Sequence, residues 1–292
     1  MEQKRRLWRK QHTDSAELDT LTIFSLTSGR SGTLSLCKLL KNNAPHCTIN
    51  HETNRSLQNP SMFGPAIYHH ATGDAAAVRG MLQKKRRAID RCRTPVYVET
   101  SHAFLKSYWD LAPEMFPKIK VFHLIRQPME VARSEANREE WMRFTYRRYR
   151  GPDGVRYKHW ALTGLEPIYR SFDVSELTLF QQYLIQWIEI ENRAMEFLRR
   201  FDMAGRCLTL HSPQALNDPA TAAAILDFAG AGRSGDVSLP GVQNRTPGHK
   251  TVLGVEEASQ LRDVIAALPS SYLEIFEHDP YADQPWASLL SK

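Results

Sequence analysis

The chain alternates short apolar runs, typical of buried strands, with longer segments in which apolar residues recur every three or four positions, typical of helices. Strands are predicted near residues 21–26, 48–50, 95–101, 119–125 and 206–210, and helices near 34–43, 74–91, 177–201, 218–229 and 255–268, with one more starting at Pro128. Asp218 and Pro219 are predicted to cap and begin the helix near 218–229. The basic run at 84–87 is typical of a solvent-exposed helix face. Residues 58–73 are rich in proline, glycine and histidine, which predicts a loop. Strands alternating with helices predict an α/β fold, a mainly parallel sheet with helices on both faces, and we expect one domain over residues 1–292.

Composition limits the kinds of ligand and the cellular compartment expected for this domain. The formal net charge of +6 favours an anionic ligand or acceptor. The four cysteines form no Cys-x-x-Cys pair, which argues against a zinc site or a disulfide framework and fits a reducing compartment. Residues 1–19 are a basic arm without the apolar core of a signal peptide, and no run approaches the ~20 apolar residues of a membrane span. We therefore expect a cytoplasmic protein.

The segment that follows the first predicted strand has the features of an anion-binding loop. Its two glycines let backbone N–H groups approach an anion closely, and the next helix begins there with the positive end of its dipole. Arg30 adds a permanent positive charge, and the hydroxyls of Ser31 and Thr33 add donors. The candidate binding residues are Ser28, Gly29, Arg30, Ser31, Gly32, Thr33 and Leu34.

This loop only partly meets the nucleoside triphosphatase pattern Gly-x-x-x-x-Gly-Lys-[Ser/Thr], because Arg30 stands for the lysine and Phe24 for the first glycine. Arg-Ser-Gly-Thr after a strand instead resembles the 5′-phosphosulfate loop of sulfotransferases that use 3′-phosphoadenosine 5′-phosphosulfate (PAPS). A second segment places Arg126 at a strand end and Ser134 eight residues later, in the following helix. This arrangement resembles the 3′-phosphate motif of the same family.

The resemblance implies a sulfotransferase fold and transfer of the sulfuryl group of PAPS to a hydroxyl or amine, releasing adenosine 3′,5′-bisphosphate. It places Arg126 and Ser134 on the 3′-phosphate and Arg30 at the 5′-phosphate, where charge develops. Because Arg30 is a permanent cation, we expect no metal requirement. Residues 244–250 are similar in position to the family's C-terminal basic loop over the nucleotide, which makes Arg245 and Lys250 candidate contacts.

Sulfuryl transfer also needs a general base to remove the acceptor proton. Glu52 is favoured, because it follows the second predicted strand and protein-tyrosine sulfotransferases carry a glutamate base at a similar place. Glu99, at the end of the third predicted strand, is the second candidate. Cytosolic small-molecule sulfotransferases use a histidine, so histidines near strand ends are further alternatives. These are His51, His102 and His123.

Residues 137–175 mix arginines with tryptophans and tyrosines, and we expect this insertion to bind the acceptor and to be mobile without it. The mixture suits a small molecule, a glycan or a peptide as acceptor, or the surface of a homo-oligomer. It also suits RNA, because bases stack on aromatic side chains beside cations, but nucleic acid is not an expected partner. Two other functions stay open. One is a P-loop kinase of nucleotides or small molecules, which would need magnesium, and the other is a non-catalytic nucleotide- or RNA-binding module.

Overall fold

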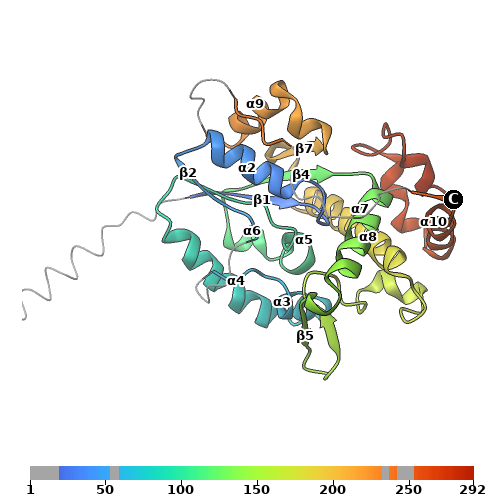
Figure 1. Ribbon diagram of the computed structural model, residues 1–292. Helices are drawn as coiled ribbons and strands as arrows, with labels where there is room; N and C mark the ends of the chain where they lie inside the picture. The colour runs from blue at the N-terminus through green and yellow to red at the C-terminus, as the bar shows by residue number, and fades with distance from the viewer. Residues whose placement is uncertain (1–19, 53–58, 232–236, 242–252) are drawn as a thin grey trace, which may run out of the picture.

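The computed structural model describes residues 20–52, 59–231, 237–241 and 253–292 (Figure 1). Within these ranges, five strands form one parallel sheet in the order β2-β3-β1-β4-β7. The strands are β1 (Leu21–Leu26), β2 (Cys47–Asn50), β3 (Val96–Glu99), β4 (Ile119–Ile125) and β7 (Cys207–His211). The predicted α/β fold with a parallel sheet is confirmed.

Helices and a small hairpin make up most of the remaining described chain. The helices are α2 (Thr33–Asn43), α3 (Pro65–Ala71), α4 (Ala75–Asp90), α5 (Phe104–Ser107), α6 (Ala112–Met115), α7 (Pro128–Met142), α8 (Leu179–Arg200), α9 (Pro219–Phe228) and α10 (Val255–Ala267). Strands β5 (Arg148–Arg150) and β6 (Arg156–Lys158) form an antiparallel hairpin. A short 3₁₀ turn, η1 (Arg143–Thr145), connects α7 to this hairpin.

Local chemistry explains where several helices begin. Asp218 accepts a hydrogen bond from the Thr221 backbone and Pro219 occupies the first turn of α9, as the sequence predicted. Thr178 and Gln181 form a capping box at the start of α8. The loop predicted over residues 58–73 is wrong in its second half, which forms α3. Pro65 occupies the first turn of that helix, where proline is tolerated, so it marks a helix start rather than a break.

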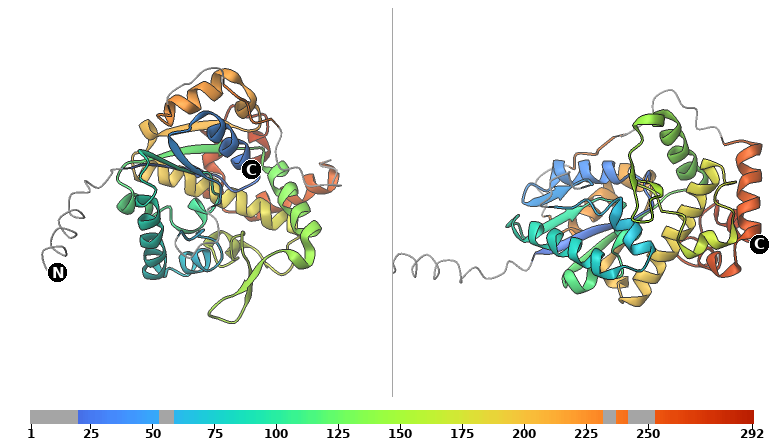
Figure 2. Two further views of the ribbon diagram at one scale, coloured as in Figure 1. Left: turned by 60° about the vertical axis from the view of Figure 1, so that its left-hand side comes forward. Right: turned by 90° about the horizontal axis from the view of Figure 1, so that it is seen from below.

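Side chains that alternate along the strands build a separate apolar layer on each face of the sheet. Ile23 and Phe122 pack with the buried residues of α2 and α9, whereas Phe24 and Val121 pack with those of α4, α5, α7 and α8. Figure 1 shows α2 and α9 on one side of the sheet and α3 and α4 on the other. In the views of Figure 2, α10 (red) lies beside α8 (yellow), in agreement with their residue contacts.

The order of the strands fixes where a ligand should bind. From the central strand β1 the chain passes through α2 to β2 on one side, and from β4 it passes through α7 and α8 to β7 on the other side. The direction of the connections therefore reverses between β1 and β4. Open α/β sheets bind ligands beyond the carboxyl ends of their strands at such a switch point. The residues after β1 and β4 are thus placed together at this edge.

Candidate active site

The loop after β1 has a backbone shaped for close approach to a ligand. Gly29, Arg30 and Gly32 have φ angles of 111°, 52° and 92°, in the left-handed region that favours glycine. Ser31 Oγ donates to the Gly29 carbonyl at 3.0 Å, which holds the turn. Gly32 is the N-cap of α2 and supplies no side-chain cap, so no side chain of the cap satisfies the N–H groups of the first turn. Such a turn, ending in an uncapped helix, is a site for an anion.

Both glycines of the loop are also needed because neighbouring elements pack directly against them. A Cβ atom at Gly29 would lie 2.8 Å from Glu135 Oε1 and 3.4 Å from the His102 ring. A Cβ atom at Gly32 would lie 2.9 Å from Ser212 Oγ, in the segment after β7. The loop is therefore surrounded by α7, by the turn after β3 and by the segment after β7. Sequence reasoning did not identify Ser212.

The two segments that resemble PAPS-binding motifs meet at Arg30. Its Nε donates to Ser134 Oγ at 2.9 Å, and Arg126 Nη1 donates to the Arg30 backbone carbonyl at 2.9 Å. Arg126 also binds Glu130, with Nε and Nη2 at 3.0 and 2.9 Å from Oε2. Burial lowers the pKa of Arg30, and the nearby charges of Arg138 and Arg126 lower it further against the opposing effect of Glu135. Its guanidinium stays a cation at neutral pH, since a free guanidinium titrates above 12.

Glu52 lies just after β2, and its carboxylate points toward His102, whose ring lies beside Gly29 of the loop. Its Oε1 is 3.2 Å from His102 Nε2 and 3.8 Å from His51 Nε2. Its φ of 47° is unusual for a residue other than glycine, and such conformations cluster at functional sites. Burial alone would raise the pKa of Glu52, but the hydrogen bond from His102 and the charge of Arg138 hold it well below its usual range. Glu52 is therefore a carboxylate at neutral pH.

Lys106 fixes the orientation of the His102 ring. Its Nζ lies 2.9 Å from His102 Nδ1 and donates to the Trp160 carbonyl at 2.7 Å. An ammonium group only donates, so Nδ1 is an acceptor and the ring proton is on Nε2, where it donates to Glu52. Burial, and then the charge of Lys106, lower the pKa of His102, so the ring is neutral near pH 7. Burial also lowers the pKa of Lys106 to about 8.

Helix α7 contributes two more charged groups that sequence reasoning missed. Glu135 is buried against Gly29, and Arg138 Nη1 lies 3.7 Å from Glu135 Oε2. The Arg138 guanidinium also stacks over the Trp160 ring at 4.8 Å. The spacing held a signal for Arg138, because residues four apart on a helix lie on one face and Ser134 was already a candidate.

Glu99 is not placed to act on a ligand. It lies two residues after Tyr97 on the same face of β3, beneath α4. Its carboxylate is fully buried, 2.7 Å from Lys85 Nζ, and accepts from the Tyr97 hydroxyl at 2.8 Å. The basic run of α4 was interpreted as a solvent-exposed face, and for Lys85 this is wrong, since its side chain is fully buried. Glu99 and Lys85 form an interior ion pair.

His123 is likewise an interior residue. Its Nε2 lies 2.8 Å from Glu191 Oε2, which also accepts from the Tyr281 hydroxyl at 2.7 Å. The structure therefore brings Glu52, His51 and His102 to the ligand edge and keeps Glu99 and His123 away from it. The other candidates, Arg245 and Lys250, lie outside the described residues, as does the basic arm 1–19.

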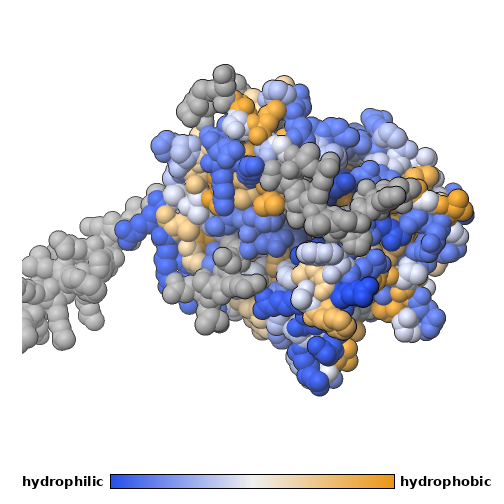
Figure 3. Space-filling model, viewed as in Figure 1, coloured by the Kyte–Doolittle hydropathy of each residue, from blue (hydrophilic) through white to orange (hydrophobic). Residues whose placement is uncertain are grey.

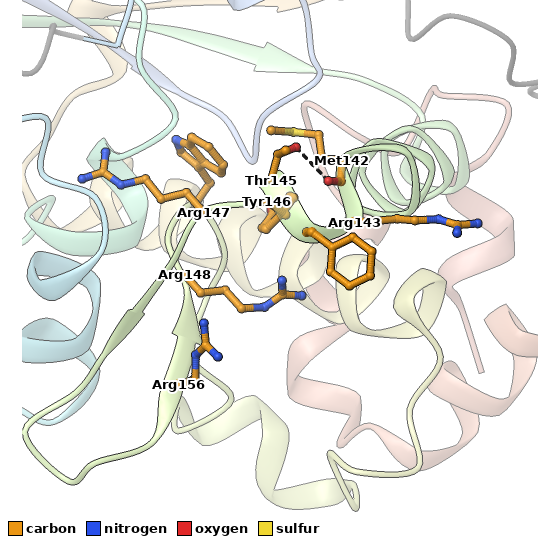
Figure 4. A pocket seen from close by; sticks show the side chains of 9 residues that line it. Met142, Arg143, Thr145, Tyr146, Arg147, Arg148 and Arg156 are labelled. Carbon is orange, nitrogen blue, oxygen red and sulfur yellow. Dashed lines mark hydrogen bonds between the residues drawn. The ribbon is translucent and has the colours of Figure 1, made fainter.

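The predicted acceptor segment, residues 137–175, lines a pocket of about 800 Å³ (Figure 4). It comprises the end of α7, the turn η1, the β5-β6 hairpin and the chain that leads to α8. The pocket is lined by Met142, Arg143, Phe144, Thr145, Tyr146, Arg147, Arg148, Arg156 and Trp160. Tyr146 is a buried part of its wall, and its hydroxyl lies 2.9 Å from that of Tyr183.

Comparisons with known proteins add little to this geometry. No family model matches the sequence, and no curated protein matches it. The chain is similar to a solved structure described as the sulfotransferase domain from the curacin biosynthetic pathway, with 14% identity, a TM-score of 0.40 and coverage of 82% of each chain. A likeness this weak carries no argument about the site. Among the described residues, no His/Cys/Asp/Glu cluster could hold a metal ion, and no helix is long and apolar enough to cross a membrane.

Lys106→Met should change how stability depends on pH. The folded-state pKa of about 8 lies below the ordinary value of 10.5, so between these values the unfolded state binds more protons and the wild type gains stability as pH rises. The free energy of unfolding of both proteins is measured in urea from pH 7 to 10. Above pH 8 the value for the wild type should rise relative to that of the variant by about 1 kcal/mol per pH unit. Lys106→Gln should give the same slope. A difference that stays constant up to pH 10 would contradict the buried-lysine interpretation.

Proposed function

We propose that this protein is a PAPS-dependent sulfotransferase. The observation that carries the proposal is the meeting of two distant segments at one loop. Arg126 and Ser134, which follow β4, contact Arg30, which follows β1, and the two strands flank the switch point of the sheet. Both segments resemble motifs that hold one nucleotide, and both lie at the edge where α/β proteins bind nucleotides.

The residues at this edge fit a nucleotide with phosphates at two positions. The turn at Gly29 and Gly32 has no room for side chains, and the uncapped start of α2 offers N–H groups to a 5′-phosphosulfate. Arg30 would neutralise charge on that group. Arg126 and Ser134 would hold the 3′-phosphate, with Arg126 exchanging Glu130 for the ligand. The bound co-substrate supplies an activated sulfuryl group.

The remaining residues serve the acceptor and its proton. The acceptor oxygen forms a bond to sulfur, the bond from sulfur to the 5′-phosphate oxygen breaks, and its electron pair leaves on adenosine 3′,5′-bisphosphate. The acceptor proton passes to the Glu52 carboxylate, whose described contacts all use Oε1 and leave Oε2 for the acceptor. A carboxylate with so low a pKa is a weak base, but the negative charges of a bound nucleotide raise its pKa. His102, oriented by Lys106, keeps Glu52 in place.

Nucleotide-dependent thermal unfolding tests the function itself. Adenosine 3′,5′-bisphosphate should raise Tm in the presence of EDTA, because ligand binding to the folded state stabilises it. Gly29→Ala should abolish this shift, since its methyl group would lie 2.8 Å from Glu135 Oε1. Gly73→Ala is the matched control, because Gly73 has a φ of 76° but a Cβ there meets nothing within 4 Å. A larger shift with ATP and magnesium would instead indicate a kinase.

Arg126→Ala should discriminate between nucleotides. Loss of a charge-assisted contact costs about 1.5–3 kcal/mol, so the Kd for adenosine 3′,5′-bisphosphate should rise at least tenfold. The Kd for adenosine 5′-phosphosulfate, which has no 3′-phosphate, should change much less, and Arg87→Ala at an exposed site of α4 should change neither. Calorimetric titration measures both constants. Equal losses would mean that Arg126 only supports the loop through the Arg30 carbonyl.

Glu52→Gln should slow sulfate transfer by about 10²–10⁴-fold while nucleotide affinity persists, because it keeps the shape of the side chain and removes its basicity. The measurement is single-turnover transfer from labelled PAPS to an acceptor found by screening. His51→Ala is the comparison, since His51 Nδ1 lies 2.9 Å from the Thr100 carbonyl and its other ring nitrogen faces Glu52. Near wild-type transfer by Glu52→Gln, with a large loss for His51→Ala, would move the base to His51.

A further inference from the structure

The β5-β6 hairpin carries positive charge that its own fold does not need. Its cross-strand pairs are Arg148 with Lys158, Tyr149 with Tyr157, and Arg150 with Arg156. Because side chains alternate between faces, the tyrosines share one face and the four cations share the other. Like charges directly opposite one another destabilise a strand pair. The two like-charge pairs therefore do not stabilise the hairpin, which points to a role in binding.

Only one of these two cationic pairs has an acidic partner within the described chain. Glu139 of α7 binds Arg148 Nη2 through Oε1 and Lys158 Nζ through Oε2, each at 2.8 Å. The ion pairs among the described residues include none for Arg150 or Arg156, and both side chains are exposed. The outer half of the hairpin is thus an uncompensated cationic surface.

The pocket beside the hairpin extends this surface. Four of its lining residues are arginines and none is acidic; the arginines are Arg143, Arg147, Arg148 and Arg156. Figure 4 shows Arg148 and Arg156 among the side chains that line this pocket. Phe144 on its rim is fully exposed, and Trp141 nearby is 57% exposed. In Figure 3 the lower part of the molecule, where Figure 1 places β5, shows hydrophilic side chains directly beside hydrophobic ones.

The pocket is connected to the candidate active site through Trp160. This residue lines the pocket, its ring lies under Arg138, and its carbonyl accepts from Lys106. Arg138 in turn lies 3.7 Å from Glu135, which packs on Gly29 of the loop. A ligand in the pocket is therefore separated from the nucleotide loop only by the side chains of Trp160, Arg138 and Glu135.

We propose that this pocket, together with the adjoining Arg150 of the hairpin, binds oxyanion groups of the acceptor, so that the molecule that receives the sulfuryl group is itself an acid. Planar guanidinium groups bind carboxylate and sulfate in bidentate fashion, and exposed aromatic side chains contact the carbon skeleton between such groups. A pocket volume of about 800 Å³ suits a small or oligomeric acid better than a nucleic acid chain. This inference rests on the proposed function for the identity of the reaction, but the binding it predicts needs no turnover.

The test is calorimetric titration of the full chain with two acids and their neutral counterparts. Tetragalacturonate is compared with its methyl ester, and sucrose octasulfate with sucrose, which separates carboxylate from sulfate recognition. The variant is Arg150→Gln/Arg156→Gln, and the matched control is Arg87→Gln/Arg91→Gln at exposed arginines at the end of α4. At least one acid should bind about tenfold or more tightly than its neutral counterpart, and the hairpin variant should lose about tenfold in affinity for it. The control should lose nothing.

Two further measurements distinguish ligand binding by Arg150 and Arg156 from a purely structural role of these residues. The Tm of the free hairpin variant should not fall, because a like-charge pair has been removed. Its affinity for adenosine 3′,5′-bisphosphate should match the wild type. Failure of both acids to bind, or equal binding of acid and neutral forms, overturns the inference, as does tighter, steeply salt-dependent binding of poly(U) at the same arginines. Acid binding without any metal-free nucleotide binding would leave the pocket intact and refute the proposed function.

Discussion

The contacts of Arg30 with Ser134 and Arg126 organise the candidate ligand edge of this protein. Arg30 can lie in its left-handed conformation because Gly29 and Gly32 relieve the turn on either side. Its guanidinium is bonded to Ser134 of α7, and its carbonyl to Arg126 at the end of β4. The bond to Ser134 joins the loop to α7, which itself packs against α8. Helix α7 places Glu135 against the loop and Glu139 against the hairpin. One helix therefore contacts both the loop and Arg148 of the pocket.

Much of this fold could be predicted because its signals are local. The β4 strand and the cap of α9 each depend on a few consecutive residues, and the structure has them where the pattern placed them. Helix α3 was missed because glycine and proline were taken to interrupt structure, whereas Gly64 and Pro65 only begin it. Lys85 was misjudged for a different reason. Its burial depends on Glu99, and no pattern in either segment shows that β3 passes beneath α4.

The residues of the candidate site differ in the same way: some have a local sequence signal and others depend on distant contacts. The loop at Arg30 and the Arg126 segment were visible because each has a characteristic local sequence. Glu135, Lys106 and Ser212 were not, because each matters only through contacts with residues distant in sequence. Glu99 could have been set aside earlier, since strand alternation places it on the same face as the apolar Tyr97 ring. Glu52 and His102 were both candidates, but their hydrogen bond joins the turns after β2 and β3 and needed the three-dimensional structure.

Lys106 links the two halves of the ligand edge in a way that has consequences for substrate binding. The same ammonium group touches the carbonyl of Trp160, in the wall of the arginine pocket, and the ring of His102, which packs on Gly29 and holds Glu52. A ligand that shifts Trp160 therefore changes the hydrogen bonds that position the nucleotide loop. Under the proposed function such coupling would be reciprocal, so that the nucleotide and the acceptor would alter each other's affinity by the same factor. Because Lys106 is buried, a change at Trp160 reaches His102 through this single ammonium group.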